Sequence, residues 1–176
     1  MGYIEYNCAT INKDLKDLIE TAVNMIEDML NNDMDIGLTA FVINQTDKKI
    51  TVSRLDTHSN RNISTGAEEI KQKAARIGAT AIVIAMEDWI VLPSDQNKLE
   101  EIIKQYGSIE NYPNRKRGIL FSIETTGDAL IAKTEIIHQN ETGKKISFKH
   151  IKFEKNNTDT GFLQNLLPTK TARTLH

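Results

Sequence analysis

This sequence has one cysteine, no long hydrophobic run and almost no net charge, and each shortage excludes a class of protein. Cys8 stands alone among 176 residues, which excludes an intramolecular disulfide framework and a multi-cysteine zinc site. Lysine and arginine number 22 against 24 acidic residues, which argues against a nucleic-acid binder that works through bulk charge. The longest apolar run, Ala79 to Met86, is far shorter than the roughly 20 residues that span a bilayer.

The motifs of several enzyme classes are also missing. The nine glycines stand apart, without a G-x-G-x-x-G, a Walker loop or a G-x-S-x-G elbow. The four histidines do not form an H-x-x-x-H or H-E-x-x-H pattern. We interpret Cys8 as a small packed residue near a helix start. The sequence therefore predicts no cofactor and, on the preferred interpretation, no resident metal.

What is present is the composition of an ordinary globular protein. Hydrophobic residues make up 39% and charged residues 26% of the chain, and a chain of this length can bury one sizeable core. The first residues, Met1 to Tyr6, have neither the basic nor the apolar region of a signal peptide. We therefore expect a cytoplasmic protein that has no membrane partner.

Three helices are predicted. Apolar residues recur at three- and four-residue steps over 13–31, and Asn12 is the expected N-cap. A second helix is expected over 65–77, opened by the capping box Thr65–Glu68. A third follows at about 95–106 and ends before a glycine.

Six segments have the composition of strands. They are 38–44, 49–54, 79–86, 118–125, 129–138 and 145–153. Segment 79–86 has apolar residues at both odd and even positions, which is typical of a strand covered on both faces, so it is the expected central strand. In the last segment Ile146 and Phe148 share one face while Ile151 and Phe153 share the other, which predicts a bulge near Lys149–His150 or an edge position.

The order α-β-β-α-β-α-β-β-β favours the α+β class. We expect a mixed, largely antiparallel sheet of five to six strands, packed against two or three helices. Residues 1–154 are predicted to form a single domain. Residues 155–176 form a polar tail with a short apolar patch, expected to be disordered or docked on its own or a neighbouring subunit.

The densest polar feature is the loop from Tyr112 to Arg117. Three adjacent cations beside a tyrosine can hold a phosphate or an acidic partner, because arginine makes paired hydrogen bonds to such groups. A solvated turn is the simpler interpretation of the same residues. A second polar loop is expected to flank the same pocket. The predicted binding residues are Tyr112, Arg115, Lys116, Arg117, His58 and Arg61.

A rival site consists of carboxylates. Glu87 and Asp88 interrupt an apolar strand, and Glu124 lies near the end of another, so the three could meet and hold a divalent cation. That arrangement would favour a metal-dependent hydrolase acting on nucleotides or nucleic acid. The alternative is that these acids only mark where the strands reach water.

The passage from Ala79 to Trp89, followed by a helix and then Tyr112–Arg117, resembles a family of small uncharacterised bacterial and phage proteins. In these, an apolar strand ends in an acidic-Trp pair and a Pro-x-Arg turn precedes a hairpin. The resemblance implies a phage or mobile-element accessory protein, with no activity attached.

The preferred hypothesis is a non-catalytic binding protein, expected to be a homo-oligomer, that engages a host protein or a small anionic, phosphorylated ligand. The alternatives are the metal-dependent hydrolase and a structural subunit of an assembly.

Overall fold

The chain folds as an α+β protein, as the sequence predicts. The computed structural model describes residues 3–8, 10–55, 62–138, 145–156 and 165–168. Its helices are α1 (Lys13–Asn31), α2 (Asn62–Ile77) and α3 (Leu99–Tyr106), with two short 3-10 segments, η1 (Pro93–Lys98) and η2 (Ile109–Asn111). Its strands are β1 (Ile4–Tyr6), β2 (Leu38–Asn44), β3 (Lys49–Leu55), β4 (Ala81–Ile90), β5 (Lys116–Thr125), β6 (Ala129–His138), β7 (Ile146–Phe148) and β8 (Ile151–Lys155).

All of these strands belong to one sheet. Their order is β1-β8-β6-β5-β4-β2-β3, and β7 pairs with β6 beyond the end of β8. Neighbouring strands are antiparallel except for the parallel pair β1–β8. The segment expected as the central strand, β4, is an interior strand between β5 and β2, but the middle of the order is β5.

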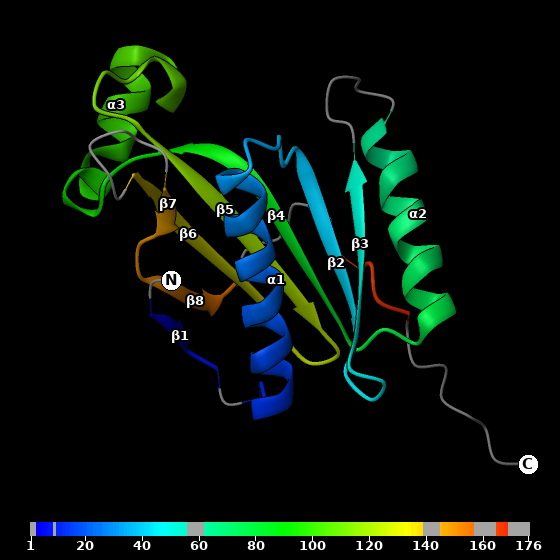
Figure 1. The fold of residues 1–176 in the computed structure, drawn as a ribbon. Helices are drawn as coiled ribbons and strands as arrows, with labels where there is room; N and C mark the ends of the chain where they lie inside the picture. The colour runs from blue at the N-terminus through cyan, green and yellow to red at the C-terminus, as the bar shows by residue number, and fades with distance from the viewer. Residues whose placement is uncertain (1–2, 9, 56–61, 139–144, 157–164, 169–176) are drawn as a thin grey trace, which may run out of the picture.

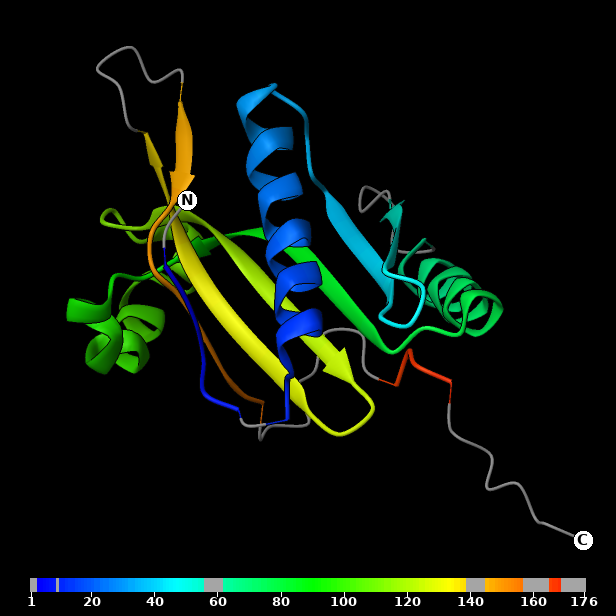
Figure 2. The ribbon, with the colours of Figure 1, turned by 60° about the horizontal axis from the view of Figure 1, so that its bottom comes forward.

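Helix α1 covers one face of the sheet (Figures 1 and 2). Its apolar stripe faces a cluster that includes Phe41, Val83 and Phe121. The expected N-cap is confirmed, since the Asn12 side chain accepts a hydrogen bond from the Leu15 amide at 3.0 Å. Capping and one-sided burial together fix where this helix begins and which face it turns inward.

Helix α2 covers part of the opposite face. Side chains of β2 and β4 such as Val42 and Ile82 pack there with Ile70 and Ala74 of the helix. Because both helices cover β2, every residue of that strand is buried. Helix α2 begins at Asn62, so Thr65 lies inside the helix and the expected start at residue 65 is wrong.

The predicted strand count and order are corrected in two places. Strand β1 was not expected, because three residues give too short a pattern to read, and it is held by parallel pairing with β8. The segment expected as one strand over 145–153 is two strands, separated at Lys149–His150. The break lets Phe148, Ile151 and Phe153 all reach the same core, which strict alternation forbids.

Residues 93–111, which comprise η1, α3 and η2, form a helical lobe at the far end of the sheet from α2 (Figure 1). Gly118 allows β5 to lie close to Thr134 of β6 and to Ile90 at the end of β4. A Cβ atom there would lie 2.6 Å from the Thr134 carbonyl oxygen and 2.8 Å from the Ile90 side chain. Glycine is required at this position for close approach, not for an unusual backbone angle.

Candidate functional site

A cavity of about 790 Å³ lies between the helical lobe and the face of the sheet that α2 leaves open. We call it the lobe cavity. Its volume is in the range of pockets that hold small organic ligands, about 300–1,000 Å³. The two sides of this cavity differ in chemistry, and that difference defines what it can hold.

The wall on the lobe side is mainly apolar. It is formed by the end of β4 and the segment after it, together with one residue from each part of the lobe; these residues are Ile90, Val91, Leu92, Gln96, Leu99 and Ile109. Leu92, Leu99 and Ile109 are half-buried, so their apolar surface faces the cavity without being fully packed. Covering such surface with a ligand is favourable by about 25 cal/mol per Å².

The side formed by the sheet is charged. Strand β6 buries alternate residues under α1 and turns Ile131, Lys133 and Glu135 to the opposite face. Strand β8 adds Lys152 and Glu154 to the lining, and the β7–β8 link adds Lys149 and His150. This alternation is the ordinary two-faced pattern of an antiparallel strand.

Most of these charges are paired. Lys149 Nζ lies 3.2 Å from Glu135 Oε2, and Lys152 Nζ lies 2.9 Å from Glu154 Oε1. The hydrogen bond and charge of Glu154 raise the pKa of Lys152. His150 contacts Glu5 of β1 at 3.3 Å.

Lys133 is the exception. Its side chain is exposed, and among the described residues it has no acidic partner within ion-pair distance. The lining therefore contains three lysines against two glutamates, and the lysine without a partner lies beside Ile131. An ammonium group is a compact positive charge that can pair with an anionic group.

The predicted Tyr112–Arg117 loop braces the lobe beside this cavity. The Tyr112 hydroxyl donates to Asp95 of η1 at 3.1 Å, and its ring lies 5.5 Å from the ring of Tyr106 in α3. The Arg115 guanidinium lies over the Trp89 ring at 4.4 Å, and its Nη1 donates to the Tyr112 carbonyl oxygen at 3.1 Å. Tyr112 thus contacts the lobe and Arg115 contacts the end of β4, and the hydrogen bond between them links the two.

The other two cations of the predicted loop, Lys116 and Arg117, are instead the first residues of β5, and they differ from each other. Arg117 Nε donates to Glu87 at 2.6 Å, whereas Lys116 is exposed and makes no ion pair within the described residues. The three adjacent cations of the sequence therefore do not form one anion-binding group. His58 and Arg61, the other predicted binding residues, lie outside the described residues.

The three predicted carboxylates are not brought together. Glu124 lies opposite Ile82, and Glu87 is five residues further along β4, roughly 16 Å away. Glu87 binds Arg117, and Asp88 accepts the Trp89 amide at 2.8 Å. Over the described part of the chain, no group of three acidic, histidine or cysteine side chains is placed to hold a metal ion.

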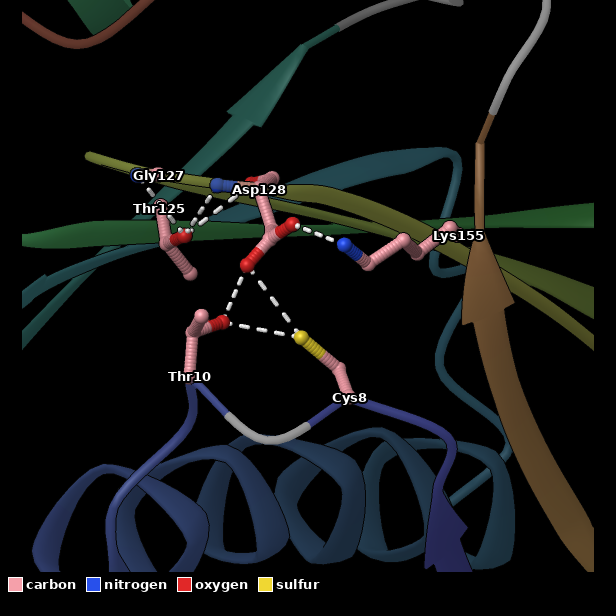
Figure 3. Close-up of polar contacts among 6 residues, drawn as sticks. All are labelled: Cys8, Thr10, Thr125, Gly127, Asp128 and Lys155. Atoms are coloured by element: carbon pink, nitrogen blue, oxygen red, sulfur yellow. Dashed lines mark hydrogen bonds and ion pairs between the residues drawn. The ribbon is translucent and has the colours of Figure 1, made fainter.

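A polar cluster that the sequence did not predict joins three segments of the chain (Figure 3). Asp128, in the β5–β6 turn, accepts hydrogen bonds from Thr10 and, at 3.2 Å, from the Cys8 thiol, and it pairs with Lys155 of β8 at 3.0 Å. The hydrogen bonds from Thr10, Lys155 and Cys8 lower the pKa of Asp128 to about 2. The cluster ties the segment before α1 to the β5–β6 turn and to the end of β8.

The fold and the lobe cavity define an α+β protein with a sheet covered on one face and half covered on the other. No family model, curated protein or solved structure matches this chain. None of the described helices is both long and apolar enough to cross a membrane.

Sequence reasoning missed Lys133 and the apolar lobe residues for an identifiable reason. Each has an ordinary role in its own element, and no local motif marks any of them. The alternation along 131–135 predicts a strand with one face in water. The sequence does not show that the lobe lies over that face.

Proposed function

We propose that this protein is a non-catalytic binding protein for a small amphipathic anion, held in the lobe cavity. The observation that supports the proposal is the lobe cavity, which has the size of a ligand pocket, an apolar wall on the lobe side and charged residues on the sheet side. On the sheet side, Lys133 has no acidic partner among the described residues. The sequence predicts an anionic ligand at Tyr112–Arg117. We place that ligand instead in the lobe cavity, next to these residues.

The ligand class follows from the two sides of the cavity. An aliphatic or aromatic body would cover Leu92, Leu99 and Ile109 and release water from them. A carboxylate, sulfonate or phosphate would lie near Lys133, which supplies a point charge rather than a paired donor group. Glu135 and Glu154 already hold the other two lysines, so the arrangement favours a ligand with a single anionic group.

A fluorescence titration with anilinonaphthalene sulfonate tests this proposal, because that probe has an apolar ring system and one sulfonate. We expect saturable binding at one site. Lys133→Met should weaken the affinity by about tenfold, which corresponds to about 1.4 kcal/mol for one charge-assisted contact. Leu99→Gln should also weaken binding, because it makes the apolar wall polar.

Lys104→Met is the matched control, since Lys104 is an exposed lysine on α3 that does not line the cavity. Thermal midpoints of all variants must match the wild type, because this probe also binds partly unfolded chains. Equal affinities for Lys133→Met and Lys104→Met would contradict the proposal.

A further inference from the structure

A short segment after the last strand packs on the face of the sheet opposite α1, beside α2. It consists of Asn165–Pro168, and the Leu166 side chain is 1% exposed. Leu166 packs in the core cluster formed by α2, β2 and β4, with Leu167 against its margin. The segment is drawn in red beside α2 in both ribbon views (Figures 1 and 2).

Glu124 holds the backbone of this segment. Its two carboxylate oxygens accept the Leu166 amide at 2.9 Å and the Leu167 amide at 3.0 Å. Each oxygen therefore binds a main-chain donor, and charge-assisted hydrogen bonds of this kind are the stronger ones in proteins. Because Pro168 has no amide hydrogen, the series of donors stops at Leu167.

The groove that holds this segment, which lies between α2 and β5, makes few contacts that depend on the sequence of the segment. Both hydrogen bonds that Glu124 accepts from the segment come from backbone amides, and within the segment Leu166 is the residue whose side chain is fully buried. Asn165 and Pro168 are exposed. The wall on the outer side is the surface of α2, with Glu68, Lys71 and Gln72. Two successive amides can point to one carboxylate only where the backbone is bent, and here Asn165 has a φ of 59° and Leu167 lies in a bend. An apolar pocket beside a carboxylate that holds two such amides can bind a bent peptide segment.

We propose that the groove between α2 and β5 is a peptide-binding site for a bent segment that presents a leucine, and that Asn165–Pro168 occupies it as a displaceable intramolecular ligand. The partner is a protein with an accessible Leu-Leu or Leu-apolar sequence and free backbone amides. Binding of that partner requires release of Asn165–Pro168, so the groove is closed until a competing segment displaces it. This inference does not depend on the lobe cavity.

Amide hydrogen exchange on the full wild-type chain tests the proposal. The Leu166 and Leu167 amides should exchange more slowly than unprotected amides, because Glu124 accepts both. Excess synthetic peptide with the sequence of residues 163–170 should speed their exchange by about tenfold or more as it displaces the docked segment. A peptide that carries Leu166→Asn should have little effect. Unchanged exchange with the unaltered peptide would overturn the proposal.

Two substitutions in the full chain separate the two contacts. Leu166→Asn weakens the intramolecular ligand, so it should raise the affinity for the labelled peptide about tenfold over wild type. Glu124→Gln keeps the shape of the side chain but removes its charge, and it should lower peptide affinity in the Leu166→Asn background. Glu135→Gln, on the same face but paired with Lys149, is the matched control. Equal peptide affinity for the two Glu→Gln variants would overturn the role of Glu124.

Sedimentation identifies what occupies the groove without added peptide. A monomer whose Leu166 and Leu167 amides are protected supports an intramolecular ligand. A dimer that becomes a monomer on Leu166→Asn would mean that a second copy supplies the segment, which would overturn the intramolecular part of the proposal.

Discussion

On the face of the sheet opposite α1, one half is covered by the chain itself and the other half is open. On β2 and β4 this face has residues such as Val42 and Ile82, and it is covered by α2 and Leu166. On β6 and β8 it has Lys133, Glu135, Lys152 and Glu154, and it lines the lobe cavity. One continuous sheet therefore changes from core to ligand-accessible surface within a few strands.

The difference shows that the charge pattern of each strand decides what may cover it. An uncompensated lysine or glutamate is costly to bury, so a helix of the chain does not settle on β6 and β8 as α2 does on β2 and β4. The open half keeps apolar surface at the lobe, which the proposed ligand would cover, and charged side chains that water can hydrate.

The largest expected effect is a core truncation in the covered half. Ile82→Ala should lower the free energy of unfolding by about 2–5 kcal/mol, because Ile82 is buried under α2 and the change leaves a cavity. Ile131→Ala in the open half should cost less than about 1 kcal/mol, because Ile131 is only half-buried. Urea unfolding of both variants measures the contrast, and equal losses would remove the distinction between the halves.

Gly118→Ala should have the next largest effect, about 1–3 kcal/mol, because the new methyl group would overlap the Thr134 carbonyl oxygen and Ile90. Gly127→Ala is the matched control in the same hairpin, since nothing lies within 4 Å of its Cβ position. Thermal unfolding of both variants is the measurement. A neutral Gly118→Ala would mean that β5 does not pass as tightly below Ile90 as described.

Arg115→Ala should cost about 1 kcal/mol, because it removes the cation–π contact with Trp89 that fastens the lobe. Lys116→Ala should change the free energy of unfolding by no more than a few tenths of a kcal/mol, since Lys116 is exposed. Chemical denaturation compares the two. A loss in Lys116→Ala equal to that in Arg115→Ala would show that the loop acts as a single charged patch.

The smallest effect at neutral pH is expected at the β5–β6 turn, where Asp128 joins Cys8, Thr10 and Lys155. Its pKa in the folded protein, about 2, is below the ordinary value of 3.8, so its contribution to stability is present above about pH 4 and is lost as the pH falls through 2. Asp128→Asn should lower stability at neutral pH, and between pH 5 and 2 its stability should fall less than that of wild type. Parallel pH profiles of thermal midpoint would contradict this assignment.

The sequence was sufficient to predict elements whose pattern is local and long. Over 13–31 the helical periodicity and Asn12 agree, and the structure has that helix with that cap. The interior position of β4 likewise follows from its apolar run. In these places local preference and tertiary packing favour the same structure.

Features set by distant contacts could not be predicted in this way. Strand β1 exists through its pairing with β8, and the break at Lys149–His150 lets one face of the sheet be filled. In the sequence, Glu124 is an acidic residue near the end of a strand. Its hydrogen bonds go to the amides of two residues more than 40 positions away, which no local pattern indicates. The lobe cavity has the same origin, since its two sides come from segments far apart in the chain.

The most direct test of the lobe cavity is a map of the amide resonances that shift when anilinonaphthalene sulfonate is titrated into the ¹⁵N-labelled protein. We expect the largest shifts at Leu92, Leu99 and Lys133, with little change at Val42 and Ala74 in the covered half. Shifts concentrated on the covered half, or spread evenly over the chain, would contradict the assignment of the open half as the binding surface.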